Sequence, residues 1–186
     1  MSVTSGSSTP HLIHALGSEA DRNPIARKLI IVPTFGMGRE LLRRLSLERI
    51  GWAGFEITTP HTLALQLARL GLDRESLRTL DAFEQQSLLD EALDLCISSG
   101  DAALGNLSEG VGLREKVYGA VSALRMAGIE ASALESARLT TLSKRLFLLQ
   151  MLKYYERLLY ERRQADSALI FQLALDALET EGNQLP

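Results

Sequence analysis

The sequence is poor in the residues that most often carry metal, redox or disulfide chemistry. Its 186 residues include one cysteine, Cys96, and three histidines, His11, His14 and His61. A single cysteine excludes an intramolecular disulfide framework and a Cys-rich zinc site. His11 and His14 lie three residues apart, which can place both on one helix face, but no glutamate-flanked metalloprotease pattern accompanies them. We therefore expect neither a metal site nor a resident cofactor in this chain.

Long apolar runs and a large net charge are also missing. No run approaches the ~20 residues that a membrane-spanning helix needs, so we expect no membrane partner. Lys plus Arg number 20 and Asp plus Glu 23, which gives a formal net charge of −3 and no whole-chain field that favours nucleic acid. Residues 1–10 lack the apolar core of a signal peptide. A cytoplasmic, reducing setting is the resulting expectation.

Aromatic residues are scarce at 5% of the chain, whereas hydrophobic residues make up 46% and charged residues 23%. These proportions are typical of a globular protein and exclude disorder throughout. Leucine supplies much of the apolar content, and a Leu-rich, aromatic-poor core favours helices over a β-sandwich. We expect an α/β fold that is predominantly helical.

Two strand–helix pairs follow each other in the first part of the chain. Residues 28–32 form a branched apolar run that predicts a buried strand, and a helix is predicted over 39–49. Residues 55–58 predict a second short strand, and a helix follows over 61–70. This order favours two parallel strands with helices packed on them.

The other predicted elements are helices, and no strand is expected after Thr59. Asp81 and Glu84 have the spacing of a capping box, which marks a helix start. A Gly/Ser/Asn-rich loop is predicted over residues 98–112. The predicted helices cover residues 11–16 ending near Gly17, a segment beginning at Asp81, residues 113–127 ending at Gly128, 131–137, 141–163 and 166–179. A small α/β part is thus expected to precede a large all-helical part.

Two corners between strand and helix carry the residues best suited to an anion. Residues 33–39 combine a hydroxyl, two glycines and a helix start, and residues 58–62 have the same character. The carboxyl ends of parallel strands meet at one sheet edge, where ligands of open α/β sheets bind. The N–H groups of a helix start suit a phosphate oxygen. The corners therefore favour phosphate contacts, with an ordinary solvated helix face as the alternative.

The predicted helix over residues 141–163 interleaves basic side chains with tyrosines. Such interleaving can serve single-stranded nucleic acid, because bases stack on aromatic rings. Glu156 and Glu161 dilute the positive charge, however. Tyr155 falls on the apolar side of the helix, so we expect it in the core and not at a ligand.

The order of these motifs resembles the N-terminal part of UvrD/Rep-type superfamily 1 helicases. Residues 30–34 (IIVPT) with residues 39–45 (RELLRRL) are similar to their motif Ia, and residues 59–64 (TPHTLA) resemble their T-x-H-x-L-A motif. Residues 80–89 look like the start of their helical 1B insertion, and residues 155–174 resemble the segment that closes it. The resemblance is strongest to the AddB nuclease–helicase subunit and the related RecB/RecC group, which process broken DNA ends for recombinational repair.

The resemblance implies a domain division. Residues 1–27 would be an N-terminal segment with a short helix at the position of a degenerate P-loop. Residues 28–79 would be a βα helicase-like 1A portion with part of its parallel sheet. Residues 80–180 would form the all-helical 1B-like insertion, and residues 181–186 a tail.

The resemblance also implies DNA contacts. In the helicases, motif Ia and the T-x-H motif contact the backbone of single-stranded DNA. Carried over residue by residue, Thr34 and Arg39 would make the first contact, and Thr59 and His61 the second. Weak DNA binding through backbone contacts and a partner helicase/nuclease subunit are therefore expected.

The Walker A glycine-lysine-threonine of these helicases is absent from residues 1–9. The remaining motor motifs and any nuclease domain would lie beyond Pro186, so we expect an N-terminal part of a larger polypeptide. This chain alone is not expected to be an enzyme, and ATP and Mg²⁺ would belong to the parent complex. The alternative is a helical protein–protein interaction module without nucleic-acid binding.

Overall fold

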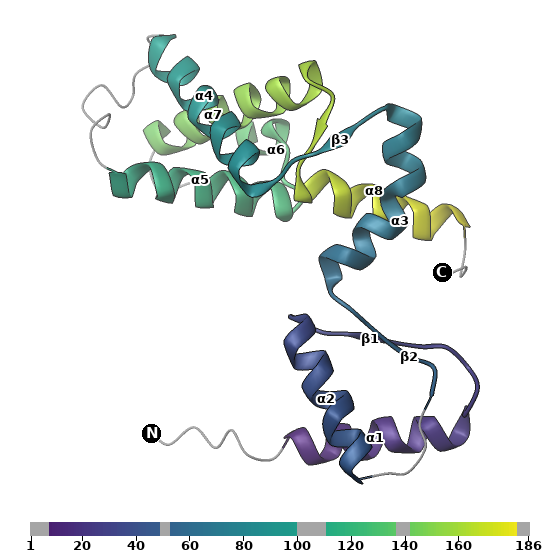
Figure 1. The fold of residues 1–186 in the computed structure, drawn as a ribbon. Helices are drawn as coiled ribbons and strands as arrows, with labels where there is room; N and C mark the ends of the chain where they lie inside the picture. Colours follow the sequence, from purple (N-terminus) through teal and green to yellow (C-terminus); the bar gives the residue numbers. More distant parts are fainter. Residues whose placement is uncertain (1–7, 49–52, 100–110, 137–141, 182–186) are drawn as a thin grey trace, which may run out of the picture. The chain divides into compact units, whose positions relative to one another are not determined.

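A computed structural model describes residues 8–48, 53–99, 111–136 and 142–181 of the chain. The chain divides into two compact units, Met1–Leu63 (unit 1) and Ala64–Pro186 (unit 2). The described residues are predominantly helical, with a small parallel sheet in each unit (Figure 1). The expected α/β, predominantly helical class is confirmed. The expected division between residues 79 and 80 stays a prediction.

Each unit has its own set of elements. Unit 1 contains α1 (Ser8–Arg22), β1 (Lys28–Ile31), α2 (Phe35–Glu48), β2 (Phe55–Thr58) and the start of α3 (Pro60–Glu75). Unit 2 contains the rest of α3, then β3 (Arg78–Thr79), α4 (Ala82–Ser98), α5 (Val111–Met126), α6 (Ala131–Ser136), α7 (Leu142–Glu161), β4 (Gln164–Ala165) and α8 (Ser167–Glu181). None of the described helices is both long and apolar enough to cross a membrane.

The sheet of unit 1 consists of β1 and β2, which are parallel and in register. Ile30 pairs with Ile57, and Ile31 pairs with Thr58. Helix α2 comes so close to this sheet at Gly38 that a Cβ there would overlap the Cγ2 of Ile57. The two predicted parallel strands are confirmed, and a residue without a side chain allows the helix to pack against them.

The expectation that the first strand is buried is wrong. Leu29 is 41% exposed and Ile31 is 55% exposed. Residues of one strand alternate between the two faces of a sheet, and the α2 contact at Ile57 lies on the other face. The apolar run predicted burial on both sides, as in a fully covered parallel sheet.

The first two helices are longer than predicted. Helix α1 passes through Gly17 and ends at Arg22. Ile13, Gly17 and Ala20 are all buried, and their spacing of four and three residues continues one helix face through the glycine. Helix α2 begins at Phe35, four residues before the predicted start, because Thr34 caps it.

Unit 2 has a helical core in which α4, α5, α6 and α7 pack together. Tyr155 on α7 is 1% exposed, so its predicted place in the core is confirmed. The predicted capping box is also present: Asp81 Oδ1 accepts from the Glu84 N–H at 2.8 Å, and Glu84 Oε2 accepts from the Asp81 N–H at 3.0 Å. Gly128, with φ of 68°, follows the end of α5 as expected.

The expectation of no strand after Thr59 is wrong. Strands β3 and β4 pair in parallel, with Arg78 opposite Gln164 and Thr79 opposite Ala165. Strands of two residues carry no detectable alternation, so the sequence gives no signal for them. Their pairing joins the end of α3 to the start of α8, which also share a small apolar cluster.

Candidate functional site

The carboxyl ends of β1 and β2 meet at one edge of the unit 1 sheet, and a helix begins after each. Because Ile31 pairs with Thr58, the segments that follow start side by side. A hydrogen bond of 2.9 Å from the Val32 N–H to the Thr58 carbonyl continues the ladder to this edge. The structure thus brings the two predicted corners together. We call Thr34, Arg39, Thr59 and His61 the strand-edge site.

Both threonines of the strand-edge site cap the helices that follow them. Thr34 Oγ1 accepts from the Met37 N–H at 3.4 Å, and Thr59 Oγ1 accepts from the Thr62 N–H at 3.2 Å. The Thr59 hydroxyl also shares a hydrogen bond of 2.9 Å with the Thr62 hydroxyl. These hydroxyls therefore fix two helix starts at the sheet edge. The sequence pattern predicted direct ligand contact and missed this positioning role.

The start of α2 presents backbone donors at the same edge. The first N–H groups of a helix have no acceptor inside the helix. Among the described residues, the N–H groups of Phe35 and Gly36 show no hydrogen-bond acceptor, and both residues are exposed. Such amides suit an anionic oxygen, and the positive end of the helix dipole adds to the attraction.

Arg39 supplies an uncompensated positive charge next to this helix start. Its side chain is exposed and makes no ion pair within the described part of the chain. Two neighbouring arginines differ: Arg43 Nε and Arg44 Nε each bind a different oxygen of Glu40 at 2.8 Å. Within the described part of α2, Arg39 therefore carries a charge without an ion pair, whereas Arg43 and Arg44 share the carboxylate of Glu40. His61, like Arg39, is exposed.

The Glu40 contacts predict an unusual titration. Hydrogen bonds from Arg43 and Arg44 lower the pKa of Glu40 to about 2. A lowered pKa means that the contacts are complete above the ordinary glutamate pKa and are lost as the pH falls through about 2. We expect NMR titration of the Glu40 carboxyl to give a much lower pKa than in the Arg43→Gln/Arg44→Gln double variant.

High salt should reduce the difference in the Glu40 pKa between the unchanged chain and the double variant, because exposed charges are screened. Equal Glu40 pKa values in the two proteins at low ionic strength would show that the arginine contacts do not form in solution.

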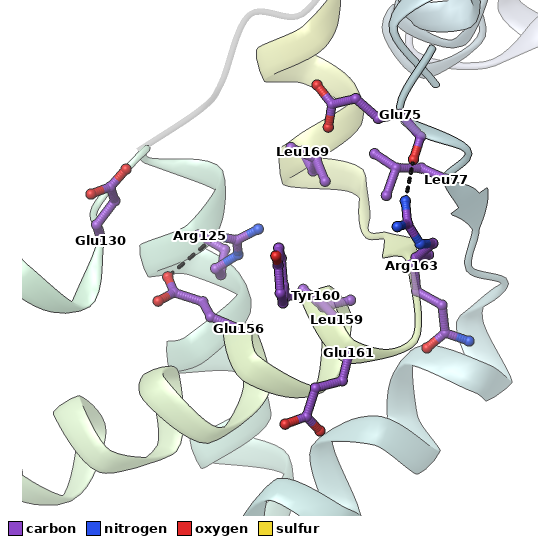
Figure 2. Close-up of a pocket in the computed structure, with 11 residues that line it drawn as sticks. Glu75, Leu77, Arg125, Glu130, Glu156, Leu159, Tyr160, Glu161, Arg163 and Leu169 are labelled. Carbon is purple, nitrogen blue, oxygen red and sulfur yellow. Dashed lines mark hydrogen bonds and ion pairs between the residues drawn. The ribbon is translucent and has the colours of Figure 1, made fainter. Parts of the chain in front are cut away.

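A groove in unit 2 is a second feature of functional interest, and the sequence did not predict it. Its volume is about 670 Å³ (Figure 2). The groove is lined by Glu75, Leu77, Arg125, Glu130, Glu156, Leu159, Tyr160, Glu161, Arg163, Gln164 and Leu169. These residues come from the end of α3, the end of α5, α7, β4 and the start of α8, and from the connections that hold Leu77, Glu130 and Arg163, so only the folded chain assembles them.

Arg125 on α5 links the groove to the core of unit 2. Its Nε lies 3.1 Å from Asp166 Oδ2, and its Nη1 lies 3.3 Å from Glu156 Oε1. The side chains of Arg125 and Asp166 are 17% and 2% exposed. Burial is the largest single influence on Arg125 and disfavours its charge, but the hydrogen bond to Asp166 and the negative charges of Asp166 and Glu156 together outweigh this cost and raise the pKa of Arg125.

The two carboxylates that bind Arg125, those of Glu156 and Asp166, differ in their surroundings. Burial raises the pKa of Glu156, and Arg125 opposes that shift only in part. Asp166 has a second task, because its Oδ1 accepts from the Leu169 N–H at 2.9 Å and so caps α8. Asp166 is the first residue of the helix predicted over residues 166–179, but its partner Arg125 lies 41 residues away and gave no signal.

Metal ligands do not gather in the described ranges: no group of three or more His, Cys, Asp or Glu side chains is placed to hold an ion there. His11 and His14 are both exposed on α1. Residues 1–7 of the expected N-terminal segment 1–27, which would hold the degenerate P-loop, lie outside the described residues. Residues 182–186 of the expected tail also lie outside them.

Comparison with models of known protein families and with curated proteins gives no match for this sequence.

Proposed function

We propose that this chain is a non-hydrolysing, DNA-contacting and structural part of an ATP-dependent helicase/nuclease subunit that acts in the repair of DNA double-strand breaks. The sequence motifs that resemble UvrD/Rep-type helicases suggest this class. The observation that carries the proposal is the strand-edge site, where two capped helix starts and the open charge of Arg39 share one sheet edge.

A single-stranded DNA backbone suits this edge chemically. Two N–H groups at the start of α2 and the guanidinium of Arg39 are donors for phosphate oxygens, and such contacts are independent of base sequence. Few contacts of this kind are available, and each is sensitive to salt. Binding by the chain alone is therefore weak. ATP and Mg²⁺ belong to the parent complex in this proposal, and the setting is the cytoplasm.

Fluorescence anisotropy with a labelled oligo(dT) tests the proposal. We expect a Kd no tighter than about 1 μM at 150 mM salt, the range of non-specific binding. Arg39→Gln should weaken binding about threefold, as expected for one exposed charge contact. It should also reduce the slope of log K against log salt by about 0.7, because one phosphate contact to a single strand is lost.

Arg43→Gln is the matched control, because it removes the same charge from the same helix. Arg43 is bound to Glu40, so its loss should change neither the affinity nor the salt slope by more than a small fraction. Equal effects of the two substitutions would contradict a contact at Arg39. Nanomolar affinity in 150 mM salt would contradict the estimate of few contacts.

A protein–protein interaction module is the second candidate, and one observation favours it. Leu142 and Leu146, four residues apart on α7, are both exposed, as are Leu175 and Leu178 on α8. Leucines at these spacings lie on one face of their helix. If no DNA binding is measured even at low salt, this second function is the better account.

A further inference from the structure

Three charged side chains further along α2 than the strand-edge site are linked by hydrogen bonds. Arg43 binds Glu40 through two of them, from Nε to Oε2 at 2.8 Å and from Nη2 to Oε1 at 2.9 Å. Arg44 adds a third, from its Nε to Glu40 Oε1 at 2.8 Å. A bidentate arginine–carboxylate pair is the geometry in which an exposed ion pair persists best. The Glu40 carboxylate is therefore held by both arginines.

Arg43 continues the helix face that carries the phosphate donors of the strand-edge site. Gly36, Arg39 and Arg43 follow each other at intervals of three and four residues, which places them on one face of α2. The Cβ atoms of residues four apart in a helix are only about 5–6 Å from each other. The side chain of Arg43 is 61% exposed, so a ligand can reach it. Without its bonds to Glu40, Arg43 would be the next phosphate donor along this face.

The bonds to Glu40 occupy the donors of Arg43 that a phosphate would use. Arginine binds a carboxylate and a phosphate in the same way, through two parallel N–H···O bonds. Hydrogen bonds from Arg43 and Arg44 lower the pKa of Glu40 to about 2, so the carboxylate is charged at neutral pH. Glu40 also lines the same groove of unit 1 as Gly36, where its negative charge repels a phosphate.

We propose that Glu40 withholds Arg43 from the phosphates of a bound strand and so leaves Arg39 as the side-chain donor of α2. Arg44 supports this arrangement, because it holds the same carboxylate. The inference rests on the proposed function, in which single-stranded DNA is the ligand. The chain thus carries a limit on its own DNA affinity, which keeps the contact weak and easily released.

Salt-dependent anisotropy with a short oligo(dT) tests this role of Glu40. Glu40→Gln keeps the size of the side chain and releases Arg43, so the affinity should rise about threefold, as expected for one further exposed charge contact. The slope of log K against log salt should steepen by about 0.7, because one more phosphate of a single strand is contacted. Arg43→Gln, which should have no effect in the unchanged chain, should remove both gains in the Glu40→Gln background.

Glu56→Gln is the matched control at the opposite end of the sheet. Glu56 accepts two hydrogen bonds from Arg27, at 3.0 Å and 2.8 Å, so its replacement also removes one charge and releases one bidentate arginine. Arg27 precedes β1, whereas the strand-edge site follows β1 and β2. The affinity for the short strand should therefore stay unchanged. Equal gains from Glu40→Gln and Glu56→Gln, or an equal effect of Arg43→Gln in both backgrounds, would overturn the proposal.

Inorganic phosphate separates this inference from the proposed function. In NMR titrations at low salt, phosphate should shift the Nε–H signal of Arg43 in the Glu40→Gln chain and leave it in place in the unchanged chain. If this response is seen but oligo(dT) does not bind, the DNA proposal alone is contradicted. An equal shift of the Arg43 signal in both chains would overturn the role of Glu40, even if oligo(dT) binds.

Discussion

Replacing Arg125 with methionine should destabilise unit 2 by about 3–5 kcal/mol, because the substitution leaves a buried carboxylate without its counter-ion. Asp166 is 2% exposed, and Arg125 is its cationic partner. Because a domain is stable by only about 5–15 kcal/mol, this loss is a large part of the total. Urea unfolding followed by circular dichroism measures it.

Two further variants make this result specific to the buried pair. Arg114→Met removes an arginine from the same helix, but Arg114 and its partner Asp90 are both about two-fifths exposed. This control should cost less than about 1 kcal/mol. Adding Asp166→Asn to Arg125→Met should recover much of the loss, since asparagine is neutral and still caps α8. A double variant no more stable than Arg125→Met would contradict the buried-charge explanation.

Replacing Gly38 with alanine should destabilise unit 1 by about 1–3 kcal/mol, the usual cost of overpacking. The new Cβ would overlap Ile57 Cγ2, which belongs to a β-branched side chain within the sheet and has little freedom to move. Either α2 or β2 must shift. Thermal unfolding of the variant and the unchanged chain gives the difference.

Gly36 is the matched control on the same helix. A Cβ there would meet only Thr34 Oγ1, at 3.9 Å. Gly36→Ala should therefore stabilise α2, by up to about 1 kcal/mol, because alanine has the higher helix propensity. The two chemically identical substitutions are expected to differ in sign. If both Gly38→Ala and Gly36→Ala stabilised the protein, α2 would not pack closely against the sheet at Gly38.

Local patterns in the sequence predicted much of the fold. The order of strands and helices gave the parallel pair of β1 and β2, and the spacing of Asp81 and Glu84 gave the start of α4. The period of apolar residues on α7 placed Tyr155 in the core. Each of these signals lies within a few residues of the feature that it predicts.

Features set by distant contacts were not predictable in this way. Gly17 resembled a helix end, but α1 continues through it because its buried face continues. The pairing of β3 with β4 joins segments more than 80 residues apart and leaves no pattern in either. The exposure of Leu29 and Ile31 was not predictable either, because an apolar run does not reveal which faces of a sheet are covered.

The two candidate sites also differ in whether local patterns or distant contacts form them. The strand-edge site was predictable because each corner is a local motif, although the capping role of Thr34 and Thr59 was not. The unit 2 groove was not predictable, because its lining comes from several helices, a strand and their connections, spread between residues 75 and 169.

We propose that the backbone of single-stranded DNA binds at the strand-edge site. The most direct test is a titration of the isotope-labelled full chain with oligo(dT) at low salt, followed residue by residue by NMR. We expect the amide signals of Phe35, Gly36 and Arg39 to shift together with those of Thr59 and His61, and added salt to reverse the shifts. Shifts confined to unit 2, or shifts that persist in high salt, would contradict it.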